Sequence, residues 1–150
     1  MAALSRRLII IARQNMAVKR LMTAPGVGTL VAMAYVSVID APERFANSAN
    51  VGAYVGLTPR RHQSGEDAYT GRISRCGDKL LRTYLFEAAG VILNRVSKWS
   101  TLKAWGTRLA KRAGTRKATV AVARKLAVIL HRMLRDGTEF RWSAKQGQPV

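Results

Sequence analysis

Residues 78–98 read DKLLRTYLFEAAGVILNRVSK, and this stretch decides the fold class of the chain. Its apolar side chains recur three or four positions apart, the spacing that places them on one face of an α-helix. The stripe consists of Leu81, Leu85, Ala88, Ile92 and Val96. Asp78 precedes the stripe and can accept a hydrogen bond from the free backbone amides of a first helical turn. The sequence therefore predicts a helix from Lys79 to about Lys98, and a mainly α fold.

Further helices are predicted on both sides of this segment. Apolar spacing indicates helices over residues 3–22, 29–39 and 115–135, a short helix through Val55, and a helix or turn that carries Trp99 and Trp105. Ser48 is expected to cap the short helix with its side chain, and Gly56 to end it. Asp136-Gly137 is expected to end the last helix. His131 lies in that helix among basic residues, and it is predicted to lie on the surface.

Residues 57–77 are polar and lack helical spacing, so they are predicted to form a loop with a short strand around Arg72-Ile73. A loop of this length inside a compact domain is uncommon unless it has a function. We expect one mainly α domain that contains a helix-hairpin-helix and covers residues 21–142. A helical arm over residues 1–20 would precede it, and a frayed tail over residues 143–150 would follow.

The charge of the chain is strongly one-sided. It has 26 Lys and Arg against 8 Asp and Glu, a formal net charge of +18, and no acidic residue between Glu87 and Asp136. The cations in that interval are Arg95, Lys98, Lys103, Arg108, Lys111, Arg112, Arg116, Lys117, Arg124, Lys125, Arg132 and Arg135. Such helices repel themselves unless a polyanion accompanies them. Nucleic acid, DNA or RNA, is favoured over an anionic membrane as that polyanion.

Cysteine and histidine usage restricts the chemistry. Cys76 is the single cysteine, which excludes an internal disulfide or a four-cysteine zinc site and fits a reducing cytosol. His62 and His131 are the two histidines, and no metal-ligand spacing is present. The apolar run from Leu8 to Ala12 is too short to span a membrane. We therefore expect no metal or cofactor in this chain, no membrane partner, and a place in the cytoplasm.

The turn Pro25-Gly26-Val27-Gly28 separates two predicted helices, a pattern typical of a helix-hairpin-helix. Its glycines allow a partner to approach the backbone closely. The free amides at the start of the next helix can then bind a phosphate, helped by the helix dipole. Gly26 and Gly28 are therefore candidate phosphate-binding residues, and the alternative is a plain turn between two helices.

The segment from Gly56 to Gly65 reads GLTPRRHQSG and places a serine hydroxyl beside a glycine and two arginines. A serine needs a base or a cationic setting to act as a nucleophile. The candidate phosphate-binding cations are Arg60, Arg61, Arg72, Arg75 and Lys79, which can neutralise phosphate oxygens. Gly65 leaves room for a phosphate, and either His62 or Asp67 can accept the proton of Ser64. The alternative is an ordinary solvated Ser-Gly turn.

Several short motifs follow one another in an order that resembles a known transposase class. They are residues 21–32, residues 40–45 (DAPERF), residues 56–60 (GLTPR), residues 63–65 (QSG) and residues 71–77 (GRISRCG). From about Met16 to Trp142 the chain is similar to the C-terminal transposase domain of the IS-one-ten type insertion-sequence transposases, which are bridge-RNA-guided serine recombinases. Cys76 departs from the small or polar residue that many members carry at this position.

The resemblance implies that Ser64 is a catalytic nucleophile that attacks a DNA phosphodiester, forms a transient 5′-phosphoserine link and releases a 3′-hydroxyl. It also implies DNA, a guide RNA and further copies of the enzyme as partners, in a bacterial or archaeal cell and in association with the nucleoid. Family members carry in addition an acidic RuvC-like half that binds Mg²⁺, and this half has no counterpart in the sequence. We therefore expect a fragment, a truncated frame or a decayed copy that is inactive alone. The rival function is a non-catalytic helix-hairpin-helix protein that binds nucleic acid.

Overall fold

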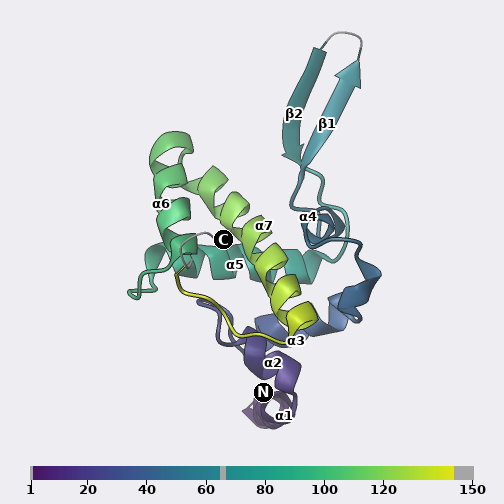
Figure 1. The fold of residues 1–150 in the computed structure, drawn as a ribbon, viewed down its shortest axis with the longest axis vertical. Helices are drawn as coiled ribbons and strands as arrows, with labels where there is room; N and C mark the ends of the chain where they lie inside the picture. The colour runs from purple at the N-terminus through teal and green to yellow at the C-terminus, as the bar shows by residue number, and fades with distance from the viewer. Residues whose placement is uncertain (1, 65–66, 144–150) are drawn as a thin grey trace.

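The computed structural model describes residues 2–64 and 67–143, without side chains for residues 60–64 and 67–71. The first half contains α1 (Ala2–Gln14), α2 (Met16–Leu21), α3 (Thr29–Ile39), the 3₁₀ turn η1 (Pro42–Arg44) and α4 (Ala49–Tyr54). The second half contains β1 (Pro59–Ser64), β2 (Asp67–Ile73), α5 (Lys79–Asn94), α6 (Thr101–Ala113) and α7 (Thr115–Asp136). Figure 1 shows a helical body from which the two strands project, at the end opposite to α1 and α2. The mainly α prediction is confirmed.

Helix α7 forms the centre of the body, and α4, α5 and α6 all pack against it. Its apolar stripe includes Val122, Leu126 and Leu130, which are fully buried. Tyr35 of α3 is buried beside this helix, and its hydroxyl donates a hydrogen bond to the carbonyl oxygen of Ala127 at 2.5 Å. Burial raises the pKa of Tyr35 well above its usual value. One continuous core therefore connects the first and last thirds of the chain.

The predicted ends of the two longest helices follow from their capping residues. The side chain of Asp78 accepts a hydrogen bond from the amide of Leu81 at 2.7 Å and begins α5. Gly137 has a left-handed backbone with φ of 66° and ends α7. Both predicted caps are confirmed, although α5 ends at Asn94, earlier than the apolar stripe indicated.

The prediction of a single helix over residues 3–22 is wrong, because the helix is interrupted at Asn15. Asn15 has an extended backbone, and its side-chain oxygen accepts a hydrogen bond from the amide of Val18 at 3.1 Å. An asparagine in this position begins a new helix. Of the residues of α1, Ala12 alone is buried, whereas α2 buries Val18 and Leu21. The break therefore separates a helix that lies on the body from one that belongs to the core.

The predictions for His131 and Ser48 are also wrong, because these two side chains are hydrogen-bonded to each other. His131 is fully buried, and its Nδ1 and Nε2 atoms lie 2.8 Å from the Ser48 hydroxyl and from the carbonyl oxygen of Pro42, respectively. A carbonyl only accepts, so we assign the proton to Nε2, with Ser48 donating to Nδ1. Ser48 precedes α4 but makes no side-chain cap, since its hydroxyl is engaged with His131.

The loop predicted over residues 57–77 is instead largely an antiparallel hairpin. The register pairs Arg61 with Thr70, His62 with Tyr69, Gln63 with Ala68 and Ser64 with Asp67, with an irregularity between Pro59 and Arg61. Below the strands, the amide of Ser74 donates to the carbonyl of Thr58 at 2.8 Å. No helix of the described part is long and apolar enough to cross a membrane.

Candidate functional site

Ser64 is the last residue of β1, and its backbone pairs with that of Asp67, the first residue of β2. His62 lies two residues earlier on β1. The two candidate proton acceptors are therefore on the same hairpin as the candidate nucleophile, and Asp67 is directly opposite it. Gly65 lies outside the described residues. The hairpin carries these groups away from the helical body (Figure 1).

Two glycines hold the base of the hairpin against the body. Gly56 and Gly77 have φ values of +76° and +83°, which side chains rarely adopt. A Cβ atom at Gly56 would lie 2.2 Å from the carbonyl oxygen of Cys76, and one at Gly77 would lie 2.1 Å from that of Tyr54. Residues 54–57 and 74–77 thus touch backbone to backbone. We call this contact the hairpin root, and it sets the direction in which the strands leave the body.

The predicted cations lie along the hairpin and at its root. Arg60 and Arg61 are on β1, and Arg72 is an exposed residue near the end of β2. Arg75 is exposed, has a positive φ of 57°, and donates its amide to the carbonyl of Gly56 at 3.1 Å. Lys79 is exposed at the first position of α5. Arg75 therefore lies in the hairpin root, Arg72 lies on β2 just above it, and Ser64 is at the far end of the strands.

The turn that carries Gly26 and Gly28 lies between α2 and α3, away from the hairpin (Figure 1). Gly26 has φ of +73°, and a Cβ atom there would lie 2.6 Å from the carbonyl oxygen of Ala88 in α5. Its lack of a side chain is therefore required by packing inside the molecule. A Cβ atom at Gly28 would meet no atom within 4 Å.

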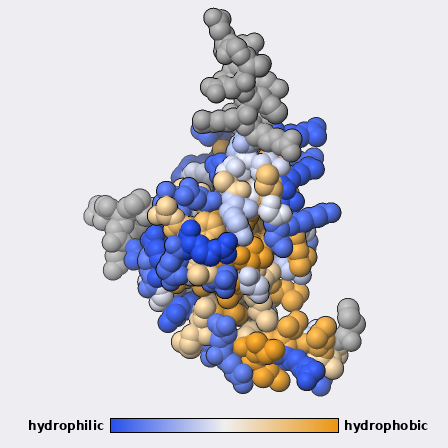
Figure 2. All heavy atoms as spheres, turned by 90° about the vertical axis from the view of Figure 1, so that its right-hand side faces the viewer, coloured by the Kyte–Doolittle hydropathy of each residue, from blue (hydrophilic) through white to orange (hydrophobic). Residues whose placement is uncertain are grey.

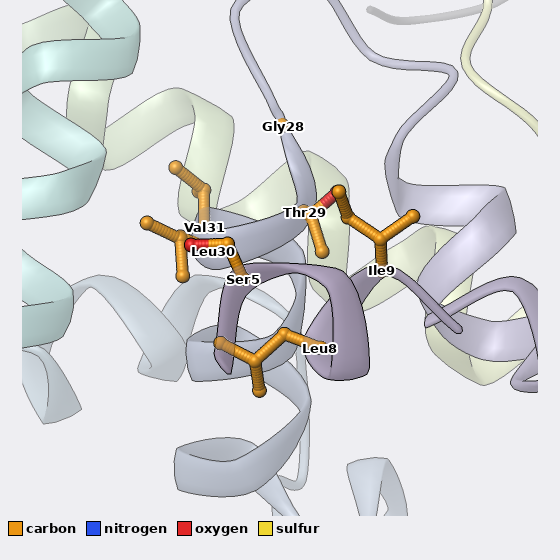
Figure 3. A pocket seen from close by; sticks show the side chains of 7 residues that line it. All are labelled: Ser5, Leu8, Ile9, Gly28, Thr29, Leu30 and Val31. Atoms are coloured by element: carbon orange, nitrogen blue, oxygen red, sulfur yellow. The ribbon is translucent and has the colours of Figure 1, made fainter. Parts of the chain in front are cut away.

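The start of α3 faces α1 across a groove of about 320 Å³ (Figure 3). The groove is lined by Ser5, Leu8, Ile9, Gly28, Thr29, Leu30 and Val31. This lining is mostly apolar, whereas a phosphate is bound best by cations and free donors. The structure does not bring this turn together with Ser64, and the helix-hairpin-helix stays a prediction.

The DAPERF motif at residues 40–45 has a structural role that the sequence analysis missed. Arg44 donates to the carbonyl of Ile39 at 3.2 Å, and its guanidinium lies 5.6 Å from the ring centre of Tyr54. The ring of Phe45 packs edge-on against His131 at 5.3 Å. The motif therefore connects the end of α3 to α4 and α7. Since His131 is far away in sequence, spacing alone gave no signal for this contact.

Within the described residues, no three His, Cys, Asp or Glu side chains gather into a possible metal site. Cys76 is a free, exposed cysteine at the hairpin root. The sequence of the hairpin offers a hydroxyl, a carboxylate, an imidazole and several guanidinium groups.

Comparison with known proteins supplies the family. The model of the Transposase IS116/IS110/IS902 family matches residues 18–105, a range that contains the whole hairpin. The transposase for insertion sequence element IS1111A of Coxiella burnetii is 33% identical over 135 residues, which are 89% of this chain and 37% of that protein. A probable family 20 transposase of Pseudomonas aeruginosa is 30% identical over 141 residues, covering 93% of this chain and 42% of that protein.

A pilin gene-inverting protein of Moraxella lacunata is 29% identical over 122 residues, which are 80% of this chain and 37% of that protein. The chain thus spans about two fifths of the length of these relatives. The ordered motifs, the family match and the relatives agree, and the chain belongs to the IS116/IS110/IS902 family of transposases.

Proposed function

We propose that this chain provides the serine nucleophile for a DNA transposition reaction. The Ser64 hydroxyl oxygen attacks a phosphodiester phosphorus and forms a 5′-phosphoserine bond. The bond from phosphorus to the 3′ oxygen breaks, and this oxygen leaves with a proton as a 3′-hydroxyl. The observation that carries the proposal is the family match, because residues 18–105 include Ser64 and both strands of the hairpin.

The hairpin register supports Asp67 as the first candidate for the group that takes the proton from Ser64. A free serine hydroxyl is a weak nucleophile and needs such a group within hydrogen-bond reach. Asp67 pairs directly with Ser64, and His62 remains the second candidate on the same strand as Ser64. Arg60, Arg61 and Arg72 then neutralise the non-bridging phosphate oxygens, and Gly65 leaves space for the phosphate.

The position of the hairpin supports a reaction that needs further components. Ser64 stands at the end of two strands that project from the body (Figure 1), and the relatives are more than twice as long as the chain. We propose that a RuvC-like portion with Mg²⁺, a guide RNA and a second copy of the enzyme complete the site. On this account the chain alone is inactive, and the completed enzyme acts in the cytoplasm on nucleoid DNA.

The second candidate function is a nucleic-acid-binding protein without catalysis. It is favoured by the segment between Glu87 and Asp136, whose charged side chains are all positive. This segment attracts DNA whether or not Ser64 reacts. The two functions differ in one observable. A covalent link between protein and DNA forms in the first and is absent in the second.

The test joins this chain to the portion of a full-length relative that the chain does not cover, and adds the matching guide RNA and DNA with Mg²⁺. Denaturing gels should show a protein–DNA adduct with the wild type and none with Ser64→Ala. Ser64→Cys should keep a trace, because a thiol can also attack phosphorus. Thr70→Ala is the matched control, since it removes a hydroxyl from the facing strand and should leave the adduct intact. Recombination by Ser64→Ala at the wild-type rate would refute the assignment of this serine.

A further inference from the structure

Two cations of α7 are held in place by neighbouring helices. A Cβ atom at Gly52 of α4 would lie 3.0 Å from Cγ of Arg124, so this glycine allows the aliphatic part of Arg124 to rest on α4. On the other side, the Lys125 ammonium lies 4.2 Å from the ring centre of Trp105 in α6, a favourable cation–π distance. Figure 1 shows α7 running between α6 and α4. Arg132, two turns further along, is exposed.

Arg124, Lys125 and Arg132, which we call the α7 stripe, repel one another. Burial lowers the pKa of Lys125, and the positive charges of Arg124 and Arg132 lower it further. No carboxylate of the described residues forms an ion pair with any of the three. The Asp136 carboxylate pairs with Arg135, which lowers its pKa, and the charge of Arg132 lowers that pKa further. Like charges held together with so little compensation repel one another and attract an anion. The stripe is therefore prepared for an anionic partner.

The dimensions of the stripe favour duplex DNA. Eight residues separate Arg124 from Arg132, which is a rise of about 12 Å along a helix. This matches the width of the major groove of B-form DNA, about 12 Å, so the two guanidinium groups can reach phosphates on its two edges. A-form RNA has a deep, narrow major groove and a wide, shallow minor groove, so it presents its phosphates in a different arrangement.

Three tryptophan rings help to hold lysine ammonium groups in place. The ammonium group of Lys125 lies over the ring of Trp105. The ammonium group of Lys98 lies 4.1 Å from the ring centre of Trp142, and that of Lys103 lies 5.7 Å from the ring centre of Trp99. Each ring thus has an ammonium group over one face, and this contact holds a cation in position to meet a phosphate. Contacts of this kind fix the position of a duplex and do not read its sequence.

We propose that the α7 stripe binds the phosphate backbone of duplex DNA across its major groove and presents that DNA to the hairpin. The stripe adjoins the hairpin, because Thr58, the residue before β1, lies next to the same glycine as Arg124. This inference rests on the proposed action on DNA. It adds a binding surface that is separate from Ser64 and its strands.

The test is fluorescence anisotropy of a 30-base-pair duplex with the full chain carrying Ser64→Ala, so that binding is measured without chemistry. The triple variant Arg124→Gln, Lys125→Gln, Arg132→Gln should bind about tenfold more weakly or worse. Its log–log salt slope should fall by about 2.7 units, which is about 0.9 for each phosphate that is no longer neutralised. The control triple Arg6→Gln, Arg7→Gln, Arg13→Gln removes the same charge from α1, where all three are exposed, and should weaken binding far less.

Arg132→Gln alone guards against a folding defect, because this exposed side chain can be changed without disturbing the core. It should lower the salt slope by about 0.9 units. Equally weakened binding in the two triple variants, an unchanged slope in Arg132→Gln, or equal binding of a duplex RNA of the same sequence would each overturn the proposal. Adduct formation by Ser64 is measured separately, so a failure of either idea leaves the other testable.

Discussion

Gly26 and Gly28 belong to one turn, yet their surroundings differ completely. Gly26 has a positive φ and lies against the carbonyl of Ala88, whereas Gly28 faces open space. From sequence the two glycines were equivalent candidates for phosphate contact. The difference could not be predicted, because it depends on the packing of this turn against α5. At Gly26 a structural requirement is sufficient to explain the glycine.

Alanine at each position should separate packing from phosphate binding. Gly26→Ala should lower the free energy of unfolding by about 2 kcal/mol or more, through the strained backbone and the contact with Ala88. Gly28→Ala should change it by less than about 0.5 kcal/mol. Urea unfolding followed by circular dichroism measures both. Equal stability of the two variants would contradict the placement of the turn, and weaker DNA binding by a stable Gly28→Ala would support a phosphate contact at Gly28.

His131 shows another limit of sequence reasoning at this scale. Its partners, Ser48 and Pro42, are 83 and 89 residues away in the chain. Neighbouring basic residues predicted a surface position, but two distant hydrogen-bond partners offset the free-energy cost of burying the imidazole ring. In contrast, the caps Asp78 and Gly137 act within a few residues of themselves, and their roles could be predicted.

At the scale of elements, the hairpin is the feature that the sequence concealed. Residues 59–64 are proline and polar or charged residues, so no apolar alternation marks them as a strand. One signal was present. The dipeptide Gly65-Glu66, with glycine first, is typical of a two-residue connection between antiparallel strands. Helices such as α5 and α7 were predicted because each buries an apolar stripe, whereas the hairpin depends on backbone pairing and on its glycine root.

Gly77→Ala should open the hairpin root, since its Cβ atom would collide with the carbonyl of Tyr54. Hydrogen exchange is the direct measurement, because the amides of Ser74 and Arg75 are bonded across this root. Strain above about 1.4 kcal/mol should speed their exchange at least about tenfold. Gly90→Ala in α5 is the control, as nothing lies within 4 Å of its Cβ position, and it should leave both amides protected. Unchanged exchange in Gly77→Ala would show that the root is built differently.

At the scale of the whole molecule, the two ends have different surfaces. The hairpin and its root carry arginines, while Leu4, Ile10, Ile11 and Leu30 are exposed apolar residues of α1 and α3. Figure 2 shows this apolar surface at the end opposite to the hairpin. The sequence predicted a helical arm over residues 1–20. The boundary after residue 20 stays a prediction, and Val18, on the arm side of it, is part of the core.

Two deletions test where the arm ends. Removing residues 2–14 takes away one buried residue, Ala12, and should cost about 1 kcal/mol of stability. Removing residues 2–20 also takes away Val18 and most of α2, and should cost at least about 2 kcal/mol more. Thermal unfolding distinguishes them. A cooperative transition at the same temperature for both deletions would place the boundary after residue 20.

The central claim is that Ser64 forms the bond to DNA, and peptide mapping of the adduct tests it most directly. Trypsin cleaves after Arg61 and Arg72, so residues 62–72 (HQSGEDAYTGR) form one peptide that contains Ser64, Tyr69 and Thr70. After nuclease digestion of the adduct from the reconstituted enzyme, fragmentation of this peptide should place the residual nucleotide mass on Ser64. The same peptide from Ser64→Ala should carry no nucleotide. A nucleotide mass on Tyr69 or Thr70, or on any peptide of the Ser64→Ala protein, would contradict the account.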